Sequence, residues 1–213
     1  MFSRLIAWGK RLLGRQTSAT GCPCDKCGKF ATAFIYDVSR KTITKERRFC
    51  DQCAIHHLWI PNPTPSAPIH KAPTPQLTVR MEMDRLICFS ASTEHYIILR
   101  EADGPRRLAL TTGYFEATAL WWLLRGEPSP RPLTHDAWLN SVISLDARVE
   151  SACIHDHCDE AYIAELRLLR GEVTVSVDVR PSDALLIVLR AGVPLYITEG
   201  LLAQCAVSEP EPA

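Results

Sequence analysis

The stretch DVRPSDALLIVLRAGVPLYI, residues 178–197, gives the clearest signals for how this chain folds. The preceding run EVTVSVDV, residues 172–179, is rich in valine and has the composition of a β-strand. A helix is predicted to begin at Pro181, because the fixed φ of proline suits the first turn of a helix. A short strand, PLYI, follows at residues 194–197. The stretch therefore predicts a strand, a helix and a second strand in succession.

Upstream of this stretch, short strand-like runs alternate with helical ones from Leu77 onward. Five further strands are predicted at residues 78–89, 94–101, 106–112, 148–157 and 160–170. Gly171 is expected to turn the chain between the last of these and the strand at 172–179. Two further helices are predicted at 114–126, stopped by Gly126, and at 134–145, with Thr134 as the cap. The order predicts an α+β domain, a mixed β-sheet with about three helices, preceded by a small zinc-ribbon module.

A proline-rich segment separates this domain from the start of the chain. Residues 61–75 contain six prolines, which favour an extended backbone over helix or sheet. We therefore expect a linker that lets two modules fold independently. The predicted divisions are a basic amphipathic segment at 1–19, a zinc ribbon at 20–60, the linker at 61–76, the domain at 77–207 and a tail at 208–213.

Charge is unevenly distributed along the 213 residues. Residues 1–60 contain 11 Lys and Arg against 4 Asp and Glu, a net charge of +7, and residues 61–213 contain 13 against 20, a net charge of −7. The basic part suits nucleic acid, a lipid headgroup or the acidic part of the same chain, so a homo-oligomer stays open. The apolar fraction of 46% suffices for a buried core.

The opening MFSRLIAWGKRLLGR has helical spacing and favours either a membrane-surface helix or one docked on a partner. It is interrupted by basic residues too early for a signal peptide. No apolar run reaches the roughly 18 residues that a transmembrane helix needs. The sequence therefore predicts a soluble, cytoplasmic protein without a transmembrane segment.

Four cysteines form two Cys-x-x-Cys pairs, Cys24 with Cys27 and Cys50 with Cys53. Two such pairs can supply the tetrahedral thiolate set that structural Zn²⁺ prefers, and the residues between them alternate like a β-hairpin. A redox dithiol is the alternative, but it would need only one pair. Cys22, His56 and His57 lie close enough in sequence to compete as ligands. Cys88, Cys153 and Cys205 are expected to act as small core residues.

The segments CDKCGKFAT and FCDQCA resemble the N-terminal zinc ribbon of the activator proteins of bacterial stress-response kinase and Clp chaperone systems. The resemblance covers about thirty residues. It implies that the ribbon binds a protein partner, and it implies no catalysis.

Polar residues gather where the predicted helices begin, at Glu116, His135, Asp136, Asp178, Arg180, Ser182 and Asp183. Carboxylates with an imidazole could hold Mg²⁺ or Mn²⁺ to activate water, and Arg180 or Arg131 could pair with a phosphate. The alternative is structural, since helix starts favour Asp and Ser as caps. The run HDHCDE, residues 155–160, is read as a polar hairpin turn, with a metal site as the alternative.

Residues from about 78 to 207 resemble the bifunctional nuclease domain family. Three passages carry the likeness, GYFEATAL at 113–120, RPLTHDAW at 131–138 and DVRPSDALLIVLRAGVPLYITEGLL at 178–202. The resemblance implies cleavage of DNA or RNA, with the seven polar residues above as the catalytic set. The competing hypothesis is a non-catalytic adaptor in stress response, which the acidic balance of residues 61–213 favours, because phosphate binding usually needs a basic surface.

Overall fold

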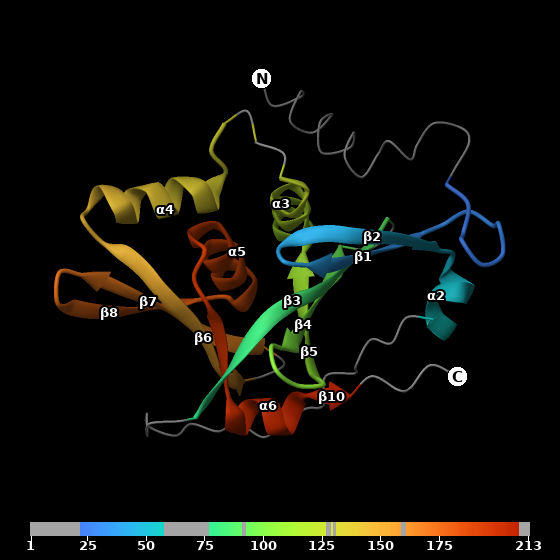
Figure 1. The fold of residues 1–213 in the computed structure, drawn as a ribbon. Helices are drawn as coiled ribbons and strands as arrows, with labels where there is room; N and C mark the ends of the chain where they lie inside the picture. Colours follow the sequence, from blue (N-terminus) through green and yellow to red (C-terminus); the bar gives the residue numbers. More distant parts are fainter. Residues whose placement is uncertain are drawn as a thin grey trace.

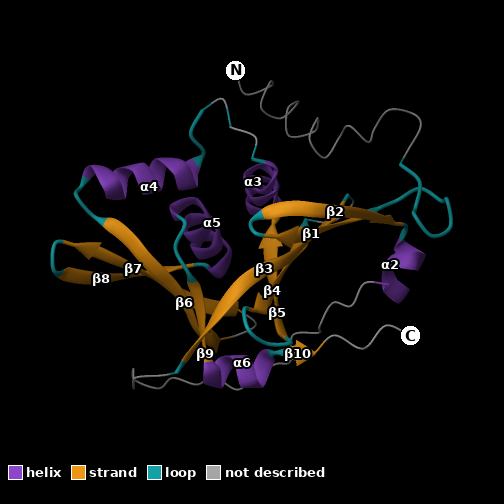
Figure 2. Cartoon of the chain, in the orientation of Figure 1, coloured by secondary structure: helices purple, strands orange, loops and turns teal. Residues whose placement is uncertain are grey.

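One ten-stranded sheet runs through the protein, with helices packed against it (Figures 1 and 2). A computed structural model describes residues 22–57, 77–90, 93–126, 129, 131–158 and 161–208. The predicted N-terminal helix, the linker and most of the predicted tail lie outside the described residues. Within the described residues, no helix is both long and apolar enough to cross a membrane.

The strands follow the sequence prediction closely. They are β1 (Ala33–Ser39), β2 (Thr42–Phe49), β3 (Thr78–Phe89), β4 (Glu94–Glu101), β5 (Arg106–Gly113), β6 (Arg148–Cys158), β7 (Ala161–Arg170), β8 (Val173–Val179), β9 (Leu195–Thr198) and β10 (Val207–Ser208). The hairpin β1–β2 turns at Arg40 and Lys41, both with positive φ, and the hairpin β7–β8 turns at Gly171. The run HDHC continues β6 and does not form the predicted turn.

The helices are α2 (Asp51–His57), α3 (Tyr114–Arg125), α4 (Thr134–Ser144), α5 (Pro181–Ala191) and α6 (Glu199–Cys205). The α+β class is confirmed. The expectation of about three helices in the second segment is corrected, because the described part of that segment contains four, and α6 was not predicted. Gly126 and Gly192 end α3 and α5 in the left-handed conformation, which glycine adopts without strain.

Strand β3 joins the two parts of the sheet. The strand order is β10-β5-β4-β3-β9-β6-β7-β8, and all neighbours are antiparallel except β6 and β9. One edge of β3 pairs with β4, while the other pairs with β9 near its start and with β1 near its end. Helices α3 and α5 pack on one face of this sheet and bury Leu120, Leu124, Leu185 and Leu186 in the main core.

The N-terminal hairpin is part of this sheet, which differs from the expectation of independent modules. Residues Ala33–Asp37 of β1 pair with Arg85–Phe89 of β3. Phe34 and Tyr36 lie in the main core, while Ile35 packs with Ile87 and Ile98 in a second core. The apolar side chains of the hairpin need this cover, because some thirty residues cannot build a core of their own.

We therefore predict that cleavage between residues 61 and 76 leaves the two fragments bound to each other. The interface consists of backbone ladder bonds and fully buried side chains, which a cut in the connection does not remove. Limited proteolysis followed by gel filtration checks this, and both fragments should elute together. Release of a free, stable fragment starting near residue 77 would contradict this prediction and would show that the two modules fold independently.

Candidate functional site

The starts of α3, α4 and α5 bring together polar side chains from distant parts of the sequence. Glu116 lies in the first turn of α3, His135 in the first turn of α4 and Asp183 in the first turn of α5. Arg180 is the residue that precedes α5, with extended backbone angles, and Pro181 occupies the first helical position as predicted. We call Glu116, His135, Arg180 and Asp183 the helix-start cluster.

Arg180 connects the cluster. Its Nη2 donates to Glu116 Oε1 at 2.6 Å and to Asp183 Oδ1 at 3.1 Å, and its Nε donates to Asp183 Oδ2 at 2.7 Å. His135 Nε2 lies 2.9 Å from Asp183 Oδ1. Glu116 and His135 are 15% and 14% exposed, whereas Arg180 is 67% exposed, so only the arginine is open to a large ligand.

The charges in this cluster stabilise one another. Burial alone would raise the pKa of Asp183, but the hydrogen bonds from Arg180 and His135 outweigh it and hold that pKa below its ordinary value. Asp183 and Glu116 in turn raise the pKa of the Arg180 guanidinium. Asp183 is therefore ionised at neutral pH.

This arrangement leaves two groups available for chemistry. A carboxylate accepts hydrogen bonds, so the bond to Asp183 places the proton of neutral His135 on Nε2 and makes Nδ1 the acceptor. Within the part of the chain that the structure describes, neither His135 Nδ1 nor Arg180 Nη1 has a hydrogen-bond partner. The site thus presents a base and a cationic donor.

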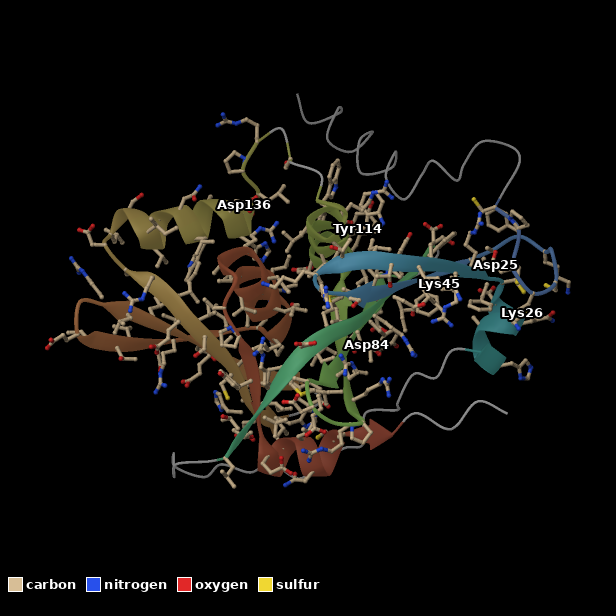
Figure 3. All side chains as sticks on the ribbon, in the orientation of Figure 1. Asp25, Lys26, Lys45, Asp84, Tyr114 and Asp136 are labelled. Carbon is tan, nitrogen blue, oxygen red and sulfur yellow. The ribbon has the colours of Figure 1, made fainter. Side chains whose placement is uncertain are left out.

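Asp136 lies in the first turn of α4 (Figure 3), but it takes part in an interaction separate from the helix-start cluster. One carboxylate oxygen accepts from the backbone N–H of Leu133 at 2.8 Å, and the other accepts from Arg190, which is only 9% exposed. Burial would raise the pKa of Asp136, but Arg190 and Leu133 lower it. Thr134 is the first residue of α4 and not its cap as predicted, since Leu133 occupies that position. Asp136 therefore anchors the start of α4 to the end of α5.

Asp178 and Ser182 do not join the cluster. Asp178 is exposed on β8, between Val177 and Val179, which pack toward the helices. Successive side chains of a strand point to opposite faces, so Asp178 lies on the face away from α5. Ser182 is buried in α5. The expectation that Asp178 converges with the others is wrong.

Arg190 is the residue that the sequence reasoning missed. It ends an apolar helix, where a basic residue is ordinary because it complements the helix dipole. Its partner Asp136 is 54 residues away in the sequence. No local signal identifies such a pair, because only the packing of α4 on α5 brings the two together.

The four paired cysteines form a second site. One ligand atom from each of Cys24, Cys27, Cys50 and Cys53 lies within 4.8 Å of the others, so they could hold a metal ion. Burial opposes ionisation of Cys24, yet backbone N–H groups of Cys50, Lys26 and Cys27 hold its pKa at about 6. The hydrogen bond with Cys27 and burial raise the pKa of Cys53 to about 12. Four cysteine sulfurs this close together are a donor set that could hold a metal ion as thiolates.

In the described residues, the cysteines are the only such group of three or more metal-binding side chains. Glu116, His135 and Asp183 do not form another, because Arg180 occupies the space between the two carboxylates. The expected Mg²⁺ or Mn²⁺ site therefore does not fit the cluster in this arrangement. His155 is exposed, and His157 is buried beside the ring of Tyr162.

The fold and the cluster define an α+β domain with a hydrogen-bonded polar network at its helix starts, and comparison with known proteins supplies the family. The family model described as the bifunctional nuclease domain matches residues 97–210, more than half of the chain. The chain therefore belongs to the bifunctional nuclease domain family.

Individual relatives agree with this assignment. Two uncharacterised proteins of Mycobacterium tuberculosis, from strains CDC 1551 / Oshkosh and ATCC 25618 / H37Rv, are each 36% identical over 115 residues. That match covers 54% of this chain and 68% of theirs. Bifunctional nuclease 2 of Oryza sativa subsp. japonica is 30% identical over 121 residues, which cover 55% of this chain and 37% of the rice protein.

Proposed function

We propose that this protein is a nuclease that hydrolyses phosphodiester bonds of DNA or RNA at the helix-start cluster. The observation that carries the proposal is the convergence of four polar side chains at the starts of three helices. Arg180 is 64 residues from Glu116, and His135 is 48 residues from Asp183. Capping explains a polar residue at each helix start, but it does not require the three starts to share one hydrogen-bond network.

His135 acts as the general base in this proposal. Its Nδ1 takes a proton from a water molecule while the water oxygen attacks phosphorus, and the bond from phosphorus to the leaving oxygen breaks. The leaving oxygen takes a proton from solvent. Asp183 is a positioning residue that holds the imidazole tautomer, as carboxylate partners of catalytic histidines do.

Arg180 binds the phosphate. Its Nη1 is available and the side chain is exposed, so it can donate to a non-bridging oxygen while Glu116 and Asp183 keep its other nitrogens in place. Residues 61–213 carry a net negative charge, so the Arg180 guanidinium is the positive group that attracts an anion to this site. The net positive charge of residues 1–60 provides a second attraction for an anion.

The cysteine site has a supporting role. Four thiolates at this spacing favour Zn²⁺, which would hold the turn before β1 and the start of α2 together. The likeness to the ribbons of kinase and Clp activator proteins supports a protein partner for this end of the chain. The ribbon then directs a nuclease to its place of action.

Incubation of the purified protein with labelled DNA and RNA tests the proposal. We expect fragments to accumulate with time, and parallel reactions with Mg²⁺, Mn²⁺ or a chelator determine whether a divalent ion is needed. Asp183→Asn should slow cleavage. If both substrates stay intact under all these conditions, the nuclease proposal is wrong. The adaptor hypothesis, which the acidic charge of the domain favours, would then replace it.

A further inference from the structure

Strand β8 is an open edge of the sheet. Strand β2, another edge, carries Lys45, Glu46, Arg47 and Arg48, and such charges discourage pairing with a foreign strand. Strand β5 is also an edge over most of its length, because β10 pairs with only two of its residues. Its apolar side chains Leu108 and Leu110 are buried, however. Among the described strands, β8 is the edge with neither protection.

The composition of β8 favours pairing. Its seven residues, VTVSVDV, include no proline or lysine and a single charge, Asp178. The valines share the face on which the helices pack, but Val173 and Val175 remain 63% and 46% exposed. Exposed β-branched residues along a free edge are a template for another strand.

The sequence of β8 is complementary to itself in one register. A two-fold axis perpendicular to a sheet keeps each face on its own side, so residues pair only with residues that point to the same face. With Ser176 on the axis, Val173 faces Val179, Val175 faces Val177 and Thr174 faces Asp178. All seven residues of the strand are then paired.

The charges that flank β8 favour the antiparallel arrangement, and the length of the strand favours this register. Glu172 lies in the turn before the strand and Arg180 follows the strand, so antiparallel pairing brings the end that carries Glu172 beside the end that carries Arg180, twice in the dimer. Opposite charges at neighbouring strand ends attract each other. Moving the axis to Val175 or to Val177 would leave two residues of each strand without a partner in the other.

We propose that two copies of this chain pair through antiparallel β8 strands with Ser176 on the two-fold axis, forming one sheet across a dimer. The exposed valines of each copy then continue the apolar face of the other. The C-terminal end of α4 lies on the side of the molecule where the β7–β8 hairpin projects (Figure 1). Ile143 and Leu145, at that end of the helix, are 57% and 64% exposed.

The dimer also connects to the helix-start cluster. The strand end that carries Glu172 of the second copy would lie beside the strand end that carries Arg180, which holds Glu116 and Asp183 in the first. Each cluster would therefore have a carboxylate of the neighbouring copy near it. This inference concerns assembly and does not depend on cleavage of nucleic acid.

Oxidative cross-linking tests the register. Ser176→Cys should give a disulfide-linked species of twice 23.8 kDa on a non-reducing gel, because residues on the axis face their own copies within disulfide reach. Thr174→Cys is the matched control, since its two copies would be four residues apart, roughly 14 Å. Equal cross-linking of the two variants, or none with Ser176→Cys, would overturn the register.

Light scattering tests the edge itself. The wild-type protein should have twice the mass of one chain, and Val175→Lys should reduce it to one, because a lysine on the edge opposes pairing. Leu77→Lys, at a position 81% exposed outside β8, should leave the dimer intact. A monomeric wild-type protein, or a dimer unchanged by Val175→Lys, would refute the proposal.

Discussion

His135→Ala is expected to lower kcat/KM for nucleic acid cleavage by about 10²- to 10⁴-fold, the usual contribution of a general base. The imidazole is the one uncharged acceptor in the cluster that neighbouring residues leave available, since its Nε2 is bonded to Asp183 at 2.9 Å. Without it, water would have to lose its proton to solvent. Steady-state cleavage of a labelled oligonucleotide by the variant and the wild type gives the measurement.

Asp178→Asn is the matched control for this prediction. Asp178 belongs to the same sequence motif as Arg180 and Asp183, yet it lies on the opposite face of the sheet and is exposed. Its replacement should leave both cleavage and the melting temperature close to the wild-type values. If His135→Ala cleaves within a few-fold of wild type, or if it unfolds the domain, the cluster is architectural.

Cys50→Ser is expected to remove a bound metal completely and to unfold the N-terminal hairpin. Elemental analysis should find one zinc per wild-type chain and none in the variant, because three thiolates leave an open and weaker site. Metal binding contributes about 10 to 16 kcal/mol to folding in isolated zinc-finger peptides, so its loss is large even where packing offsets part of it.

The effect should extend beyond the cysteines. Cys24, Cys50 and Phe49 pack with Ile87 and Ile98, which belong to β3 and β4. The melting temperature of the whole protein should therefore fall, as measured by circular dichroism. Cys22→Ser is the control, because Cys22 lies outside the group of four and its loss should leave zinc in place. Zinc-free wild-type protein, or equal zinc in both cysteine variants, would disprove the metal site.

Local signals in the sequence were sufficient for most elements. Pro181 begins α5, Gly126 ends α3 and Gly171 turns β7 into β8, as predicted, because each acts through its own backbone angles. The spacing of the two cysteine pairs likewise indicated a common site. Helix α6 was missed because it is a single short helix of seven residues with no proline or distinctive cap.

Most elements, the α+β class and the grouping of four cysteines were thus predictable from the sequence, since these depend on neighbours along the chain. Long-range packing was needed to establish that the hairpin joins the main sheet through β3, that Asp136 pairs with Arg190, and that Asp178 faces away from Asp183. These outcomes depend on which faces of distant elements pack together. Asp178 lies within β8 and faces away from the helices, whereas Arg180 lies beyond the end of the strand, directly before α5, so two residues of one motif have different surroundings.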